Sequence, residues 1–245
     1  MGYGARPMSQ YAKLAPHYRG ISQQKKTYID AVDTLILSQV PHQVSSVLDV
    51  GAADGVRGLS LARAMKAGHL TLCEPCPEMA ALCRGNAASF PGAKILECDA
   101  LALETITEQY DVILCLWNVL GHVPDNATRK RVLNVLRERL SPSGLIFMDV
   151  NNRHNAAAYG TLKVWGRRCL DAVTFNETRG NAVFNVLVGG ENIPAKGHLF
   201  TPGEMDALIA GSGLVIRQRK TVHYLSGAIS INPYQGQLFY ILEAL

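Results

Sequence analysis

The sequence predicts a doubly wound, Rossmann-like α/β fold with a mostly parallel seven-stranded sheet whose last strand is antiparallel. Three observations predict this fold. Short runs that are apolar almost throughout alternate with stretches in which apolar residues recur at helical spacing, and 48% of the 245 residues are apolar. The first apolar run ends directly in a loop of small residues, from Gly51 to Gly55. Apolar strands separated by helices form parallel sheets that are covered on both faces and bind ligands at their carboxyl ends.

The predicted elements follow one another along the chain. Apolar residues at helical spacing place helices over residues 25–40, 58–67, 77–88 and 126–140. Short apolar runs place strands over residues 46–50, 69–73, 94–98, 111–116, 145–150, 214–224 and 237–242, the last two antiparallel to each other. Pro41 is expected to stop the first helix, Asn126 to cap the fourth, and residues 141–144 to form a turn.

One segment interrupts the alternation of predicted helices and strands. Residues 151–200 are rich in Asn and Gly, and we expect them to form a substrate-cap insertion over the site. After them, Thr201 and Glu204 form a capping-box pattern that opens a helix, which ends at the glycines of 211–213. The whole chain, 1–245, is predicted to be one domain.

The N-terminal region is basic. No acidic residue precedes Asp30, whereas five Lys or Arg residues do. Such a composition is typical of a transit peptide, but Tyr11, Leu14 and Tyr18 are spaced to pack on one face of a helix. We therefore expect residues 1–40 to form an ordered N-terminal lid over an anionic site.

The composition limits the classes of partner. A net charge of +4 is too small to indicate nucleic acid, which is not an expected partner. No apolar run approaches the ~20 residues that span a bilayer, and no signal-peptide core is visible. We expect a cytoplasmic protein without a membrane partner. The sequence leaves open whether the protein forms a homodimer.

The six cysteines do not predict a metal site. Cys73 and Cys76 have the spacing of a zinc-ligand pair, but no second Cys or His pair follows at ligand spacing. In a cytoplasmic chain disulfides are not expected, and Cys73, Cys98 and Cys115 lie inside apolar strand runs. These cysteines are predicted to be small buried hydrophobic residues.

The strongest functional signal is the loop after the first strand. Small residues let the backbone approach a ligand closely, and the helix that follows offers free backbone N–H groups. The spacing Gly51-x-Ala53-x-Gly55 differs from the Gly-x-Gly-x-x-Gly fingerprint of dinucleotide-binding proteins. An acid, Asp49, stands two residues before the first glycine. The combination suits a ligand without phosphates.

Acidic residues also end the next two strands. Glu74 lies 23 residues after Gly51, where a carboxylate can accept hydrogen bonds from both hydroxyls of a ribose. Asp99 ends the third strand and can accept a hydrogen bond from an adenine amino group, with Ala100 as an apolar wall. The sequence therefore predicts a nucleoside site at this edge of the sheet.

The fourth strand contributes two further candidates. It ends at Leu116 and Trp117, where an aromatic ring can form a wall of the site. His122 follows, and histidine is the natural general base near neutral pH; His154, in the predicted cap, is its rival.

The order and spacing of these motifs resemble those of the class I S-adenosylmethionine (SAM)-dependent methyltransferases, over nearly the whole chain. The Asp49 loop resembles their first motif, Glu74 their second-strand acid and Asp99 their adenine-contacting acid. Residues 11–18 are similar to the N-terminal tyrosine segment of many small-molecule members, which folds over the methyl donor. The family's middle glycine is Ala53 here, which adds one methyl group near the cofactor.

The resemblance implies SAM as cofactor, S-adenosylhomocysteine (SAH) as product, and no metal. The cofactor-binding residues that it implies are Tyr11, Tyr18, Asp49, Gly51, Ala52, Ala53, Gly55, Glu74, Pro75, Met79, Asp99, Ala100, Leu116 and Trp117. The predicted catalytic residues, chosen from the chemistry of histidine, are His122 and His154.

Several of these residues also have a structural interpretation. Asp49 could orient the loop amides instead of contacting the methionine end of SAM, and Asp99 could cap the helix that follows. Trp117 could belong to the core, His122 to a surface loop, and the two tyrosines could only pack the lid.

The acceptor is predicted to be a nitrogen or oxygen of a small molecule, in biosynthesis. The short chain, the lid and the cap favour this interpretation, and no Asn-Pro-Pro-Tyr signature follows the fourth strand. An RNA or protein methyltransferase and a non-catalytic SAM-binding module stay as alternatives. The loop spacing argues against a nicotinamide oxidoreductase.

Overall fold

The computed structural model describes residues 8–40, 43–174, 176–188 and 190–245. Its main sheet has the strand order β3-β2-β1-β4-β5-β10-β8-β9, with β1 to β5 parallel and β10 antiparallel to both β5 and β8. The strands are β1 (Ser46–Val50), β2 (His69–Cys73), β3 (Ala93–Leu96), β4 (Tyr110–Cys115), β5 (Leu140–Val150), β8 (Leu214–Val222), β9 (Ile229–Ser230) and β10 (Gln237–Ala244). The predicted fold class is confirmed. The sheet has seven main strands, one of which is the antiparallel β10, and the two-residue β9 only extends its edge.

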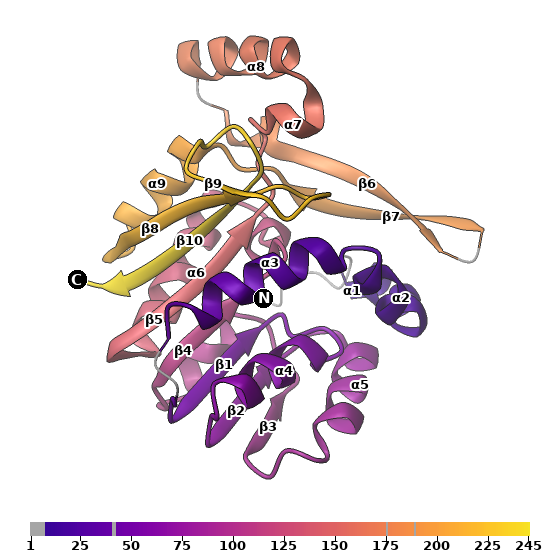
Figure 1. Cartoon of the computed structure of the whole chain (residues 1–245), viewed down its shortest axis with the longest axis vertical. Helices are drawn as coiled ribbons and strands as arrows, with labels where there is room; N and C mark the ends of the chain where they lie inside the picture. Colours follow the sequence, from indigo (N-terminus) through magenta and orange to yellow (C-terminus); the bar gives the residue numbers. More distant parts are fainter. Residues whose placement is uncertain (1–7, 41–42, 175, 189) are drawn as a thin grey trace.

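Helices cover both faces of this sheet (Figure 1). One face packs against α3 (Lys26–Leu37), α4 (Val56–Ala64) and α5 (Pro77–Ala87). The other packs against η2 (Ala102–Thr105), α6 (Asn126–Glu138) and α9 (Pro202–Ala210). Adjacent β1 residues divide between the two cores, Val47 on the α3 side and Leu48 on the α6 side, because successive side chains of a strand point to opposite faces. This burial on both faces explains the continuous apolar runs in the sequence.

The remaining elements lie outside the main sheet. They are α1 (Met8–Leu14), η1 (Ala15–His17), α2 (Tyr18–Gln23), η3 (Val119–His122), α7 (Ala156–Tyr159), α8 (Thr161–Val173), η4 (Glu177–Gly180), β6 (Asn181–Val188) and β7 (Glu191–His198). Strands β6 and β7 form a separate antiparallel hairpin, and α8 stands at one end of the molecule (Figure 1). None of the helices in the described ranges is long and apolar enough to cross a bilayer.

Four local predictions need correction. Residues 141–144 form no separate turn but belong to β5, where Tyr110 pairs with Leu140 and Val112 with Leu145, so the pairing register shifts at this point. Asp125, and not Asn126, caps α6, because its carboxylate accepts the Thr128 N–H at 2.7 Å.

The other two corrections concern helix boundaries. Tyr11, Leu14 and Tyr18 do not share one helix, because the 3₁₀ turn η1, which carries Pro16, separates α1 from α2. Helix α3 already ends at Leu37, and Pro41, its expected stop, lies outside the described residues.

The capping box at the start of α9 is confirmed. The Thr201 hydroxyl accepts the Glu204 N–H at 3.1 Å, and the Glu204 carboxylate accepts the Thr201 N–H. Because a lost N-cap costs about 1 kcal/mol, we expect Thr201→Ala to lower the free energy of unfolding in urea by about that amount. Thr107→Ala, in an exposed loop, is the matched control and should change it by less than about 0.5 kcal/mol. Equal effects of the two substitutions would contradict this role of Thr201.

Candidate functional site

The loop between β1 and α4 has an unusual backbone. Gly51, Ala53 and Gly55 have φ values of +70°, +53° and +75°. A Cβ on Gly51 would lie 2.6 Å from Val119 Cγ2, so this position has no room for a side chain. Ala53 adopts the left-handed conformation without being glycine. Ala52 and Ala53 are both buried.

Glu74 ties this loop to the end of β2. Its Oε2 accepts the Ala53 N–H at 2.8 Å and its Oε1 accepts the Cys76 N–H at 2.9 Å. The side chain is buried, which raises the pKa of the carboxyl, while the two backbone N–H groups oppose the rise. The carboxylate is thus fixed at the carboxyl edge of the sheet, with one N–H on each oxygen.

Asp49 lies at the end of β1 beside the first turn of α4. Its Oδ2 occupies the space that a Cβ on Gly58 would need, at 2.3 Å from that position. Burial raises the pKa of Asp49 to about 7, and the Arg57 guanidinium lowers it only in part. An acid in this environment gains from a cationic ligand, which would favour its ionised form.

The raised pKa of Asp49 predicts a pH-dependent stability. The folded state binds the proton of the Asp49 carboxyl more tightly than the unfolded state does. The protonated carboxyl therefore stabilises the folded state fully below about pH 4, and this stabilisation is lost as the pH rises through about 7. Asp49→Asn cannot ionise, so we expect the variant to melt at a higher temperature than the parent at about pH 8, with a smaller difference at about pH 5. Thermal unfolding of both proteins across this range is the measurement, and a pH-independent difference would contradict the assignment.

Arg57, on α4, is a functional candidate that the sequence analysis missed. Its Nε donates to Asp33 Oδ1 at 2.8 Å, and Nη2 lies 2.7 Å from the same oxygen. Nη1 is buried without a hydrogen bond among the described residues, whereas Nη2 is engaged by Asp33 in this ion pair. No motif pointed to Arg57, because its neighbour Asp33 is 24 residues earlier in the chain. The pair places a guanidinium with one unengaged terminal nitrogen, Nη1, near the Asp49 carboxyl.

The predicted adenine end is more open. Asp99 is exposed, and its Oδ1 accepts the N–H groups of Leu101 and Ala102 at 3.0 Å each. Oδ1 thus holds the backbone that enters η2, whose N-cap is Leu101, while Oδ2 accepts no hydrogen bond in the described part of the chain. Ala100 is half-buried beside it.

The end of β4 is strained. Trp117 and Asn118 both have positive φ, +62° and +64°, which is rare for two successive residues other than glycine. The Trp117 N–H donates to the Asp149 carboxylate and the Asn118 N–H to the Asp149 carbonyl. Asp149 thus holds Trp117 in place, and the indole packs against the ring of Tyr18, with centroids 5.7 Å apart, and donates to the Tyr224 hydroxyl.

Tyr11 and His122 meet across the site. The Tyr11 hydroxyl lies 2.8 Å from His122 Nε2, and His122 Nδ1 lies 3.0 Å from the Lys196 carbonyl oxygen. A carbonyl only accepts, so Nδ1 carries the proton and Nε2 accepts from the phenol. Burial lowers the pKa of His122, so the ring is neutral near pH 7, and burial raises the pKa of Tyr11, so the phenol keeps its proton.

The α1–α2 segment packs over the same edge of the sheet. Leu14 belongs to a small apolar cluster with Ala53 and Met79, and the cluster also includes Val188 of the β6–β7 hairpin. The segment and the hairpin therefore meet above the loop that follows β1. Pro75 is half-buried next to this cluster, and Leu116 is buried in the α3-side core.

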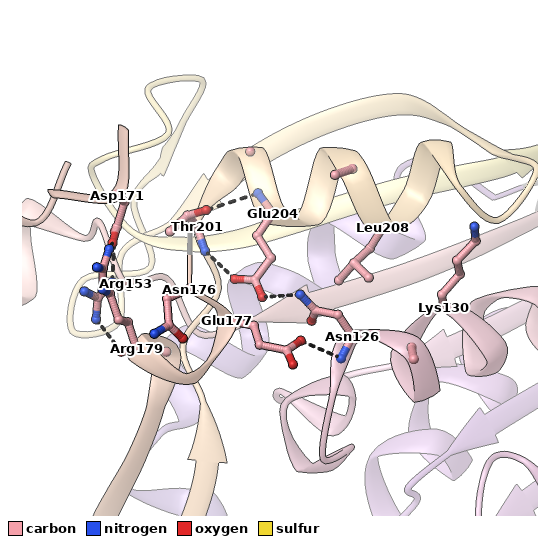
Figure 2. Close-up of a pocket in the computed structure, with 14 residues that line it drawn as sticks. Asn126, Lys130, Arg153, Asp171, Asn176, Glu177, Arg179, Thr201, Glu204 and Leu208 are labelled. Atoms are coloured by element: carbon pink, nitrogen blue, oxygen red, sulfur yellow. Dashed lines mark hydrogen bonds and ion pairs between the residues drawn. The ribbon is translucent and has the colours of Figure 1, made fainter. Parts of the chain in front are cut away.

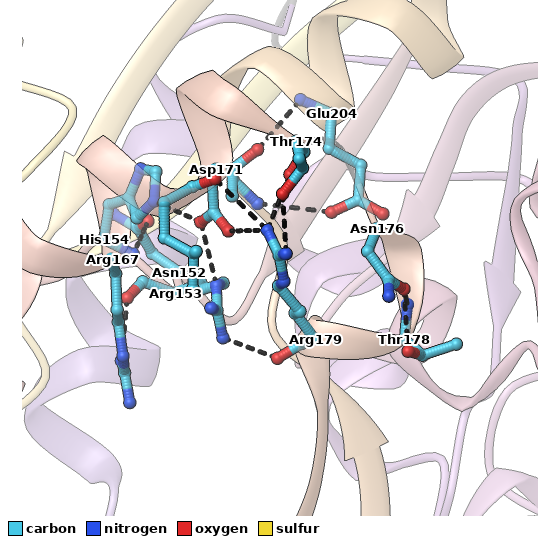
Figure 3. Close-up of polar contacts among 12 residues, drawn as sticks. Asn152, Arg153, His154, Arg167, Asp171, Thr174, Asn176, Thr178, Arg179 and Glu204 are labelled. Carbon is cyan, nitrogen blue, oxygen red and sulfur yellow. Dashed lines mark hydrogen bonds and ion pairs between the residues drawn. The ribbon is translucent and has the colours of Figure 1, made fainter.

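His154 lies in a different network (Figure 3). Its Nε2 is 3.0 Å from Asp171 Oδ2, which also accepts from Arg153 Nε at 3.0 Å. Arg179 Nη1 lies 3.5 Å from the other oxygen of Asp171. These contacts join α8 to the segment after β5, and the structure does not bring His154 together with His122 or Tyr11. In this arrangement the partner of His154 is the Asp171 carboxylate of the insertion.

A pocket of about 590 Å³ lies among α6, η4 and α9 (Figure 2). Its polar groups bind one another: Glu177 Oε2 accepts the Asn126 N–H at 3.0 Å, and Glu204 Oε1 accepts from Asn126 Nδ2 at 3.1 Å. None of the residues predicted to bind a cofactor lines it. In the described ranges no group of three or more His, Cys, Asp or Glu side chains could hold a metal ion.

Comparison with known proteins agrees with the fold and the domain type. Residues 47–144 match the family model described as a methyltransferase domain. Comparison with curated protein sequences gives no match. DhpI, solved as a DhpI–SAM–HEP complex, superposes with a TM-score of 0.69 at 14% identity, covering 98% of this chain and 100% of that one.

Two other solved structures share the fold. The CcbJ methyltransferase from Streptomyces caelestis gives a TM-score of 0.63 at 16% identity and covers 90% of both chains. A methyltransferase solved with the Haloferax volcanii Trm112 activator gives 0.68 at 14% identity, with 97% of this chain and 96% of that one covered. The matched domain contains Asp49, Glu74, Asp99 and Trp117, and the shared fold extends over nearly the whole chain.

Proposed function

We propose that this chain, a SAM-dependent methyltransferase by its domain and fold, methylates a nitrogen or oxygen of a small molecule. The observation that carries the proposal is the double cover over the carboxyl edge of the sheet. The α1–α2 segment and the β6–β7 hairpin pack together above the β1 loop, and Tyr11 of this segment bonds to His122. Such a cover suits a small acceptor better than a folded RNA or protein, which needs an open surface, and it excludes water from the reaction.

The residues at this edge fit the cofactor. We assign Glu74 to the two ribose hydroxyls and Asp99 with Ala100 to the adenine. Asp49, with its pKa of about 7, suits the α-ammonium group, and Arg57 Nη1, which has no hydrogen bond among the described residues, suits the α-carboxylate. The amino-acid end of SAM is zwitterionic, so a neighbouring acid and base match its two charges.

The proposed chemistry needs little from the protein beyond alignment and a path for one proton. Bound SAM would supply an activated methyl group on a sulfonium. The acceptor loses a proton as its new bond to carbon forms, and His122 Nε2, neutral at pH 7, is placed to receive it through Tyr11. In this path Tyr11 Oη takes the acceptor proton while its own proton passes to His122. The Lys196 carbonyl then stabilises the charged imidazolium through Nδ1–H.

The first test is calorimetric titration with SAH, with NAD as the control ligand. We expect micromolar binding of SAH and none of NAD. A screen of small hydroxyl and amine acceptors with labelled SAM follows, with bulk RNA and protein screened in parallel. Methylation of RNA or protein alone would contradict the small-molecule proposal, and SAH binding without turnover on any acceptor would favour a non-catalytic module.

The assignment of Arg57 makes a specific prediction. Arg57→Gln should weaken SAH binding about tenfold, because a hydrogen bond to a charged group contributes ~1.5–3 kcal/mol. It should leave the affinity for 5′-methylthioadenosine, which lacks the amino-acid portion, nearly unchanged. Titration of both ligands with parent and variant is the measurement. An equal loss for both ligands would show that Arg57 acts on the fold of the site, through Asp33, and not on the carboxylate.

A further inference from the structure

Helix α8 exposes its apolar side to solvent. Leu162 is 87% exposed, Trp165 64% and Val173 81%. At 3.6 residues per turn these positions share one face of the helix with the exposed Cys169, whereas Val164 and Asp171 lie on the opposite face. Val164 is buried, and Asp171 binds the residues that anchor the helix. The amphipathic pattern of an ordinary surface helix is therefore inverted, because its apolar face points away from the protein.

Basic residues border this apolar face. Lys163 and Arg168 lie on its two sides, and Arg167 lies on the inward side. None of the three forms an ion pair with any residue in the described ranges, although Arg168 stacks on the Tyr234 ring at 4.1 Å. The single acid of the helix, Asp171, is already paired with Arg153 and His154. The rim of the apolar face is thus positively charged and uncompensated.

From this arrangement we propose that α8 docks on an anionic lipid surface. An apolar face that contains Trp and Leu, flanked by Lys and Arg, is the pattern of helices that lie in the membrane interface. Helix α8 is about 20 Å long, too short to span a bilayer but long enough to lie along its surface. It also stands at one end of the molecule (Figure 1), where no other element lies beyond it.

A second copy of the chain fits this face less well. Two α8 helices packed through their apolar sides would bring the rims of Lys163 and Arg168 close together, and like charges repel. An anionic surface instead attracts these residues. The proposal replaces the expectation, based on the lack of a spanning segment, that the chain has no membrane partner. It does not depend on the methyl acceptor.

The test is co-sedimentation of the full-length protein with vesicles of phosphatidylcholine alone or mixed with phosphatidylglycerol. We expect binding to the mixed vesicles, weakened by added salt, with a blue shift of Trp165 fluorescence. The triple variant Leu162→Ser, Trp165→Ser, Val173→Ser should bind at least about tenfold more weakly, and Lys163→Glu about tenfold more weakly. Val183→Ser with Leu187→Ser, two comparably exposed apolar residues of β6, is the matched control and should bind like the parent.

Two results would overturn the proposal. One is equal vesicle binding by the parent and the triple variant, or no binding by either. The other is a parent dimer, detected by light scattering, that the triple variant converts to a monomer without any vesicle binding. Thermal unfolding, measured on every variant, shows that each is folded, and SAH affinity, measured in parallel, keeps this test separate from that of the proposed function.

Discussion

His122→Gln is expected to lower the turnover number about 10²- to 10⁴-fold on an acceptor found in the screen, the range that a general base contributes. Gln keeps hydrogen-bonding capacity toward Tyr11 and Lys196 but cannot take a proton. Because burial lowers the pKa of His122, the parent should stay fully active down to mildly acidic pH and lose activity only below that depressed pKa. The variant should lack this acid limb, and its SAH affinity should stay within about threefold of the parent's.

Two further variants make this prediction decisive. Tyr11→Phe should lower the turnover number nearly as much as His122→Gln if the phenol carries the proton, and far less if the acceptor reaches Nε2 directly. His69→Gln, at the exposed start of β2, is the matched control and should leave turnover unchanged. Full activity of His122→Gln would remove His122 from the mechanism.

Glu74→Gln is expected to weaken SAH binding tenfold to a hundredfold, about 1–3 kcal/mol. The neutral amide presents one oxygen in place of two, so it cannot hold both the Ala53 and the Cys76 N–H groups and also accept two ribose hydroxyls. Calorimetry with SAH measures the effect, and Glu138→Gln, an exposed residue at the end of α6, is the control. An unchanged affinity would exclude Glu74 as the ribose ligand.

Glu74→Gln also separates binding from folding. Loss of one loop hydrogen bond should lower the free energy of unfolding by about 1 kcal/mol without ligand. Adenosine, which keeps the ribose but lacks the amino-acid portion, should lose affinity with Glu74→Gln but not with Arg57→Gln. The pair of variants thus assigns the two ends of the cofactor independently.

Local sequence was sufficient wherever the relevant physics is local. Strand β1 and the small-residue loop after it follow from five consecutive residues and the spacing of Gly51 and Gly55, and the structure bears out their positions. The capping box of α9 is similar, because both of its hydrogen bonds join residues three apart. The prediction of α6 was less accurate by one residue, since Asp125 and Asn126 are both good caps and only the backbone conformation selects one.

Pairs that are distant in sequence could not be predicted in this way. The hydrogen bond between Tyr11 and His122 joins residues 111 apart, and the short contact between Tyr28 and Asp149 joins residues 121 apart. The spacing of apolar residues along the chain cannot predict such a pair. The two residues meet only because of the angle at which α1 and α3 cross the sheet. The irregularity in β5 was missed for a related reason. Ser-Pro-Ser-Gly has the composition of a turn, but Leu140 and Leu145 on either side of it both pair with β4 and keep it within the strand.

The sequence by itself determined the α/β fold, the order of its strands along the chain and the acids at their carboxyl ends. These features depend on apolar periodicity, turn residues and the rule that parallel strands end at one edge. Only the tertiary structure decided that His122 is neutral and bonded to Tyr11, that His154 belongs to a separate network, and that Arg57 lies near Asp49. Protonation and pairing depend on burial and on neighbours from distant segments, and folding alone brings those together.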